Sequence, residues 1–158
     1  MGKSKEEFMQ MAIDLAKENV EKGNGGPFGA IIVKNGEVIA TGSNSVTTSN
    51  DPTAHAEVTA IRNACKELNS FQLDDCEIYS SCEPCPMCLG AIYWARPKAL
   101  YFAADKNDAA KAGFDDSFIY KEIKLDYSDR YILTQQINAK DKLKPFEVWD
   151  VSNLKLEY

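Results

Sequence analysis

Apolar residues near the start of the chain recur with the spacing of a helix face. Between Ser4 and about Lys22 they lie three and four positions apart, at Phe8, Met11, Ala12, Leu15 and Ala16. Ser4 is the expected N-cap of this helix, and Glu7 would complete a capping box with it. The run Gly23-Asn24-Gly25-Gly26-Pro27 is expected to end the helix.

After this helix the pattern predicts a hairpin and then alternating helices and strands. The hairpin joins residues 28–33 to residues 37–41 through an Asn-Gly turn at residues 34–36. Residues 105–120 are expected to be mostly loop with a short helix. The other predicted elements are a helix over 53–68, a strand over 77–80, a helix over 86–94, strands over 98–103 and 131–136, and a helix from Pro145 to the chain end.

This order of elements predicts an α/β fold. A hairpin followed by alternating helices and strands gives a mixed sheet covered on both faces by helices, which is a three-layer α/β/α sandwich. The chain has 158 residues and carries no internal repeat, low-complexity run or linker. Residues 1–158 are therefore expected to form a single domain.

The composition of the chain argues against a nucleic-acid-binding protein and against a membrane-spanning one. The chain has 24 acidic and 18 basic residues and a net charge of −6, which disfavours a nucleic-acid partner because such a partner requires a basic face. No apolar run approaches the ~20 residues of a membrane span. The N-terminus lacks the apolar stretch of a signal peptide, so a cytoplasmic location is expected.

Two short segments carry the candidate chemistry. Residues 53–57 hold the only histidine, and residues 81–88 hold three of the five cysteines. An odd cysteine count in a reducing compartment argues against a disulfide framework. His55, Cys85 and Cys88 offer one nitrogen and two sulfur ligands, and three protein ligands leave the fourth position of zinc open for water. The sequence thus indicates one catalytic zinc ion per chain.

Other metal sites are less consistent with these residues. Cys82 as a fourth ligand would close the site and make it structural, but Cys82 lies at a strand end, whereas Pro86 begins the helix whose first turn carries Cys85 and Cys88. An iron–sulfur cluster would need a fourth thiolate from Cys65 or Cys76 and would leave the histidine unexplained.

Glu57 is the candidate catalytic residue. Zinc lowers the pKa of bound water from ~15.7 towards ~7, and a carboxylate beside that water accepts the released proton and passes it to the substrate. On its own, Glu57 would be interpreted as a solvated residue of a helix start, where the dipole favours an acidic side chain.

The segments His55-Ala56-Glu57 and Pro84-Cys85-Pro86-Met87-Cys88 resemble the zinc-dependent cytidine and nucleobase deaminase superfamily. The resemblance extends over nearly the whole chain to the bacterial guanine deaminases. The segments that carry it are Gly25-Gly26-Pro27-Phe28-Gly29-Ala30, residues 44–52, residues 89–97, Ala112-Gly113-Phe114-Asp115-Asp116-Ser117 and the terminal Glu157-Tyr158. Residues 121–143 show no matching motif.

This resemblance implies a cytidine deaminase-like fold and the hydrolysis of guanine to xanthine and ammonia. Zinc-bound hydroxide would attack C2, with Glu57 as proton shuttle. Phe28 would pack against the purine base, and Asn44 would hydrogen-bond a ring heteroatom or carbonyl. Asp116 would face the amidine edge, and Tyr158 would close the pocket from the partner subunit of a domain-swapped homodimer.

Simpler roles stay open for these four residues. Phe28 would serve in the hairpin core, Asn44 and Asp116 as caps, and Tyr158 as a frayed chain end. Against fraying, the terminal segment carries apolar residues that are costly to leave in water: Phe146, Val148, Trp149, Val151, Leu154 and Leu156.

Three functions compete. The first is guanine deamination; the second is deamination of tRNA adenosine, with cytosine or cytidine as nearby variants. The third is a zinc-stabilised binding module without catalysis. The net charge of −6 disfavours the tRNA substrate. Glu57 disfavours the binding module, because a structural zinc site has no use for a carboxylate beside the metal.

Overall fold

The computed structural model describes residues 2–158 of the chain. These residues divide into two compact units, one ending at Asp116 and one over Ser117–Tyr158. The first unit carries the four-stranded sheet and the helices packed on it. No helix among the described residues combines the length and the apolar composition that crossing a bilayer requires.

The sheet is mixed, with strand order β2-β1-β3-β4. Its strands are β1 (Gly29–Lys34), β2 (Glu37–Ser43), β3 (Cys76–Cys82) and β4 (Ala99–Ala104). β1 pairs antiparallel with both β2 and β3, and β3 pairs parallel with β4. The two central strands are the most buried, as expected for strands that are covered on both faces.

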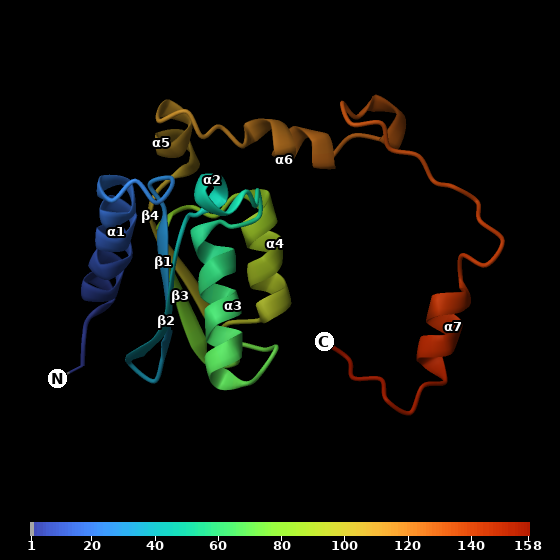
Figure 1. Ribbon diagram of the computed structural model, residues 1–158, viewed down its shortest axis with the longest axis horizontal. Helices are drawn as coiled ribbons and strands as arrows, with labels where there is room; N and C mark the ends of the chain where they lie inside the picture. Colours follow the sequence, from blue (N-terminus) through green and yellow to red (C-terminus); the bar gives the residue numbers. More distant parts are fainter. Residues whose placement is uncertain (1) are drawn as a thin grey trace. The chain divides into compact units, whose positions relative to one another are not determined.

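Helices cover both faces of this sheet (Figure 1). α1 (Lys5–Glu21) packs on one face, where Phe8 and Ala12 contact the inward side chains of Ile31 and Val33. α3 (Ala56–Leu68) and α4 (Pro86–Ala95) cover the other face. Alternate residues of β1 thus enter opposite cores, since Ile32 packs with α3 and α4. The predicted three-layer α/β/α sandwich is confirmed.

Local signals in the sequence account for several element boundaries. Ser4 and Glu7 form the predicted capping box at the start of α1. The hairpin turn has positive φ at Asn35 (52°) and Gly36 (79°), the conformation that an Asn-Gly turn supplies. The sequence did not predict the short α2 (Val46–Ser49), and α3 begins three residues later than expected.

A close approach at Gly42 sets the position of α3 on the sheet. A Cβ atom at Gly42 would lie 2.2 Å from the Ala56 oxygen and 2.5 Å from the Ala60 nitrogen. Only glycine allows the backbone of α3 this near to β2. The N-terminus of α3, which carries His55 and Glu57, is held in place by this contact.

The end of the chain differs from the sequence-based expectation. Residues 105–120 contain α5 (Lys106–Lys111) and the start of α6 (Ser117–Ile123). The strand predicted over 131–136 is wrong: the segment is irregular, and Tyr131 is 94% exposed. Residues with a preference for strands, such as Tyr131 and Ile132, form a strand only beside another strand, and none pairs with them among residues 2–158.

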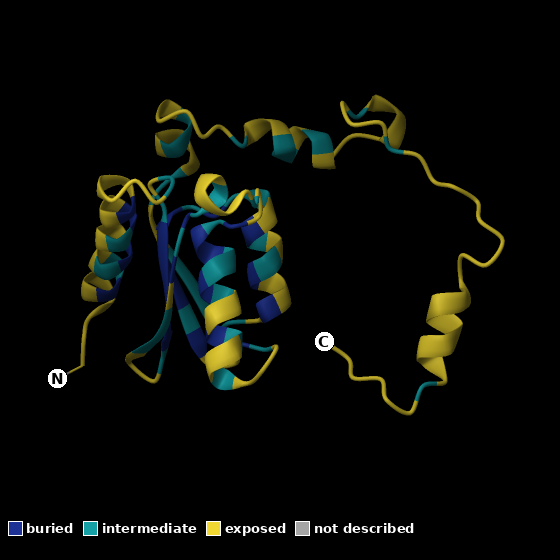
Figure 2. Ribbon diagram, viewed as in Figure 1, coloured by how far each residue is buried: buried dark blue, intermediate teal, exposed yellow. Residues whose placement is uncertain are grey.

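The predicted C-terminal helix is correct only in part. A 3-10 turn, η1 (Tyr127–Asp129), follows α6, and the helix is the short α7 (Lys144–Asp150). The chain then continues to Tyr158 as turn and coil, so it does not end in a helix. No residue of α6 or α7 is buried (Figure 2), and the second unit therefore has little core of its own.

Candidate active site

Two helix N-termini bring the candidate metal ligands together. His55 is the N-cap of α3 and Cys85 is the N-cap of α4, and both have extended backbone angles. Pro86 follows at the first position of α4, where its fixed φ suits a helix start. Cys88 lies within the first turn of α4, so its thiol points to the same end of the helix as Cys85.

The three donor atoms have the spacing that a zinc ion requires. The Nδ1 atom of His55 lies 3.5 Å from the Cys85 Sγ and 3.4 Å from the Cys88 Sγ. Zinc bonds of about 2.05 Å to nitrogen and about 2.3 Å to sulfur, at a tetrahedral angle, separate such atoms by about 3.5 Å. All three donors lie within 4.8 Å of one another. His55, Cys85 and Cys88 therefore fit a zinc ion, with Nδ1 as the histidine ligand.

The electrostatics of the group favour an ionised ligand. Hydrogen bonds from Cys88 and from the His55 ring lower the pKa of Cys85 to about 4. The hydrogen bond to Cys85 raises the pKa of His55 in turn. Two helix N-termini add favourable dipoles for a thiolate. The hydrogen bond to Cys85 raises the pKa of Cys88. A second thiolate beside the first is unfavourable without a cation, so Cys88 would ionise when a metal binds.

Cys82 lies at the end of β3 and has a separate role. Its Sγ donates to the Asp105 backbone oxygen at 3.7 Å, so the thiol has an acceptor outside the ligand group. Burial raises the pKa of Cys82 to about 11, so its thiol stays protonated. Among the described residues, the group able to hold a metal consists of His55, Cys85 and Cys88 without Cys82.

Glu57 is buried next to these donors. The side chain is 5% exposed, and its Oε2 atom lies 3.4 Å from the Cys88 Sγ. The Ser80 hydroxyl donates to Oε1 at 3.2 Å and orients the carboxylate. Burial raises the pKa of the Glu57 carboxyl, which brings it nearer to the range suited to proton transfer. Because His55 is a cap with extended backbone, its ring and the Glu57 carboxylate converge although they lie two residues apart.

Asn44 follows β2 and is buried with its amide in a fixed orientation. The side-chain oxygen accepts from the backbone N–H groups of Gly26 at 3.1 Å and Val46 at 3.3 Å. With the oxygen facing two donors, the NH₂ group of the amide is oriented to donate to an acceptor on its other side. A Cβ at Gly25 would lie 2.1 Å from the Asn44 backbone oxygen, so the loop requires glycine there.

Phe28 and Asp116 lie in the same unit as the ligand group. The Phe28 ring packs edge-on against Phe114, with ring centroids 5.0 Å apart, and also touches the core below α3. Asp116 is partly buried. Its pKa is raised mainly by burial and, to a smaller extent, by the negative charge of Cys85. The Asp116 carboxylate therefore interacts electrostatically with Cys85 of the ligand group. Tyr158 belongs to the second unit and is 69% exposed.

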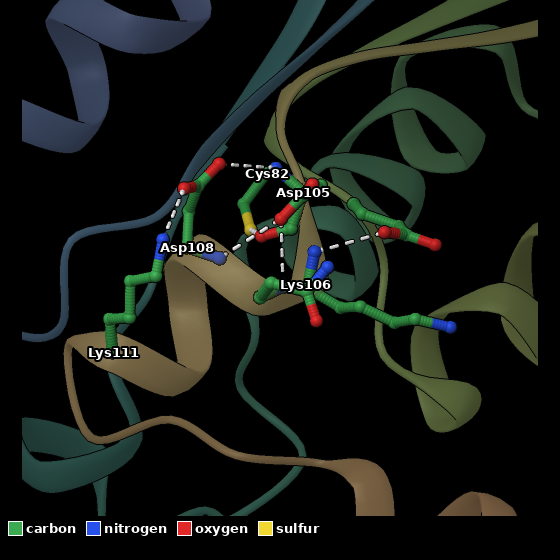
Figure 3. A network of polar contacts seen from close by, with 7 residues as sticks. Cys82, Asp105, Lys106, Asp108 and Lys111 are labelled. Carbon is green, nitrogen blue, oxygen red and sulfur yellow. Dashed lines mark hydrogen bonds and ion pairs between the residues drawn. The ribbon is translucent and has the colours of Figure 1, made fainter.

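The start of α5 is tied to the segment that precedes Cys85 (Figure 3). Asp105 caps α5 by accepting from the backbone of Asn107 and Asp108. The Lys106 N–H donates to Glu83 Oε2 at 2.9 Å, and the Cys82 thiol donates to the Asp105 oxygen. The start of α5, the helix that precedes Phe114 and Asp116 in the chain, is thus hydrogen-bonded to the segment that leads into Cys85.

The sequence does not predict the roles of three residues at the site. Ser80 orients Glu57, Phe114 packs on Phe28, and the buried Asn19 of α1 donates to the backbone of the Asn44 region. Two of them have a signal in the sequence: Phe114 lies in a segment that carries the family resemblance, and Asn19 continues the apolar stripe of Phe8, Ala12 and Ala16 with a polar side chain. Contacts such as Ser80 to Glu57 join distant segments, and no local pattern reveals them.

The fold and the ligand group define a zinc deaminase. Residues 2–104 match the profile of the family described as the cytidine and deoxycytidylate deaminase zinc-binding region, and the chain belongs to this family. Within that family, the chain is 62% identical to guanine deaminase of Bacillus subtilis over 153 residues, which cover 97% of this chain and 98% of the relative.

Two further comparisons extend this finding. A crystal structure of guanine deaminase from Bacillus subtilis superposes with a TM-score of 0.97 at 61% identity and covers 99% of both chains. The tRNA-specific adenosine deaminase of Aquifex aeolicus is 48% identical over 103 residues, which cover 65% of this chain and 68% of the relative. Because the match to the Bacillus enzyme covers 99% of both chains, it includes the second unit of this chain.

Proposed function

We propose that this protein is a zinc-dependent guanine deaminase that releases ammonia and xanthine from guanine and water. His55, Cys85 and Cys88 hold one zinc ion per chain. A zinc ion held by these residues would supply a polarised water molecule with a pKa lowered from ~15.7 towards ~7. A reducing compartment such as the cytoplasm suits the site, because it keeps the cysteines free as ligands.

The observation that carries the proposal is the place of Glu57. Its buried carboxylate lies 3.4 Å from the Cys88 Sγ, with a raised pKa and one oxygen oriented by Ser80. A carboxylate in this place can carry the first proton of the attacking water to the ring nitrogen, and then carry the second proton, from the hydroxyl added to C2, to the amine that departs as ammonia. A zinc site that only stabilises the fold has no need of it.

Guanine is favoured over the other substrates by the extent of the match. The relative named guanine deaminase aligns with 97% of the chain, whereas the tRNA-specific adenosine deaminase aligns with 65%. The polar groups suit the base as well. The NH₂ of Asn44 donates to a carbonyl or ring acceptor, and the Asp116 carboxylate accepts from the amidine N–H groups. Phe28 lies against the flat face of the purine.

A second copy of the chain is the proposed partner. The second unit exposes large apolar side chains, among them Leu133 at 90% and Leu154 at 93%. Such a surface is costly in water and is usually covered by another protein surface. In a domain-swapped homodimer the second unit of one chain packs on the other, and Tyr158 of the partner subunit closes the pocket over the base.

Ammonia release from separate substrates tests the function. The zinc-loaded protein is incubated with guanine, adenine, cytosine, guanosine and a tRNA anticodon stem-loop. The proposal expects turnover of guanine with little from the other substrates. Turnover of the stem-loop in preference to guanine would assign the chain to the tRNA deaminases, and no ammonia from any of the five would contradict catalysis of this kind.

A further inference from the structure

Asn19 is a buried polar residue on an otherwise apolar helix face. It lies one helical turn after Ala16 on α1 and is 5% exposed. A primary amide removed from water costs free energy unless it is hydrogen-bonded, so a residue of this kind needs partners. Its neighbours on the stripe, Phe8 and Ala12, pack in the core below α1.

Both donors of the Asn19 amide are used, and they bind two different segments. The Nδ2 atom donates to the Gly26 carbonyl at 2.9 Å and to the Asn44 carbonyl at 2.8 Å. Gly26 lies in the loop that follows α1, and Asn44 lies after β2. One side chain therefore joins the helix, the glycine loop and the segment that carries Asn44.

The same glycine loop is bound a second time, by the side chain of Asn44. Asn44 Oδ1 accepts from the Gly26 N–H, while the Gly26 carbonyl accepts from Asn19 and also from the Phe28 N–H at 2.9 Å. Gly26 is thus held through both its N–H and its carbonyl. Movement of this loop would shift the acceptor contacts of Asn44 and the backbone of Phe28 together.

From this network we infer that Asn19 is a positioning residue for base recognition. It fixes the backbone of Asn44 and of Gly26, and Gly26 in turn fixes the Asn44 oxygen, so that the NH₂ group of Asn44 is held out as a donor. Asn19 does not touch the base itself. The inference rests on the proposed function in one respect, since it takes Asn44 as a residue that binds the base.

The first test separates positioning from general stability. Asn19→Ala removes both donors, and Asn19→Ser keeps a single hydroxyl donor. Losing hydrogen bonds of ordinary strength should raise the KM for guanine roughly tenfold in Asn19→Ala, with a smaller rise in Asn19→Ser and little change in kcat or zinc content. A lower melting temperature with an unchanged KM would mean that Asn19 only anchors α1, and would overturn the inference.

Asn63→Ala is the matched control. The Asn63 amide also donates to a backbone carbonyl, that of Thr41 at 2.9 Å, and also joins a helix to β2. This hydrogen bond links α3 to the middle of β2 and does not involve Asn44 or the glycine loop. Asn63 is exposed, so the variant should lose one hydrogen bond between a helix and β2 and keep the KM of the wild-type protein. A KM that rises as much in Asn63→Ala as in Asn19→Ala would contradict a specific role for Asn19.

A double-mutant cycle tests whether Asn19 acts through Asn44. Asn44→Ala should raise the KM by itself, and adding Asn19→Ala to it should then change the KM by less than about twofold. If the KM increase of the double variant equalled the product of the two single increases, the inference would be overturned. The cycle uses whichever base the wild-type protein deaminates. A wild-type protein that acts on cytosine instead of guanine would thus refute the proposed substrate while the cycle still decides the role of Asn19.

Discussion

Cys82 and Cys85 are three residues apart and differ in chemistry. Cys85 has a pKa lowered to about 4 by its hydrogen bonds, and it faces His55 Nδ1. Cys82 has a buried thiol that donates a hydrogen bond to the Asp105 backbone oxygen. The spacing of the cysteines alone leaves either one available as a metal ligand, and the difference arises because β3 ends at Cys82 whereas α4 begins after Cys85.

Zinc content should follow this difference. Cys85→Ala removes one of three ligands and should reduce bound zinc well below one ion per chain, whereas Cys82→Ala should leave about one ion. Elemental analysis of the purified variants by plasma emission measures both. Normal zinc in Cys85→Ala, or its loss in Cys82→Ala, would show that the ligand set is wrong.

The role of Glu57 predicts a loss of turnover without loss of metal. Glu57→Gln keeps the size of the side chain and an acceptor for Ser80 but cannot carry a proton, so activity should fall ~10²-fold or more with zinc retained. Steady-state ammonia release measures the effect. Glu67→Gln, at an exposed position of the same helix, is the control and should behave as wild type. Near-normal turnover in Glu57→Gln would remove this residue from the mechanism.

At the residue scale, the sequence predicts the groups that share a short segment. His55 with Glu57, and Cys85 with Cys88, stand out because helix starts keep neighbouring residues together. Asn19 and Ser80 do not, because their partners lie 25 and 23 residues away along the chain. Which polar residue meets which across the sheet depends on packing, and packing is settled only by the whole fold.

At the element scale, predictions succeed where local signals and sheet pairing agree. The capping box of α1, the Asn-Gly hairpin and the proline start of α4 are all encoded within a few residues. The segment 131–136 contains the strand formers Tyr131, Ile132 and Thr134 but has no strand beside it among the described residues, and it stays irregular. Residue types thus predict a preference for a strand, and a neighbouring strand decides whether that preference is realised.

The contact of α3 with β2 gives a prediction at this scale. Gly42→Ala would place a Cβ atom 2.2 Å from the Ala56 oxygen, and α3 would have to move away from the sheet. Overpacking of this kind should lower the free energy of unfolding by about 1–3 kcal/mol. Zinc affinity should fall as well, because α3 carries His55. Urea unfolding at saturating zinc, together with a zinc titration, measures the two effects.

Gly90→Ala is the matched substitution for this prediction. Gly90 lies within α4 at an exposed position, and a Cβ atom added there would meet nothing within 4 Å. Alanine there should raise the free energy of unfolding by about 0.5–1 kcal/mol, because glycine is the poorer helix former. If Gly42→Ala were as stable as Gly90→Ala, the close approach of α3 to β2 would not set the position of the helix.

At the scale of the whole molecule, the two units differ in how they bury apolar residues. The first unit has two cores, one on each face of its sheet. The second unit has no buried residue in α6 or α7, although it contains Phe146 and Trp149. Its apolar residues are predictable from the sequence, but no pattern within one chain identifies the surface that would cover them.

The proposed homodimer predicts that two impaired variants restore each other's activity when they are mixed. One variant is Glu57→Gln, and the other lacks Glu157 and Tyr158. The deletion alone should raise the KM or lower the turnover for guanine, while zinc content and the melting transition stay near those of the wild type. When the two proteins are unfolded and refolded together, some sites should combine an intact Glu57 from one chain with an intact Tyr158 from the other. The expected result is more ammonia release from the refolded mixture than from the two proteins assayed separately at the same concentrations. A monomer in sedimentation, or exchange of subunits without recovered activity, would contradict a pocket closed by the partner subunit.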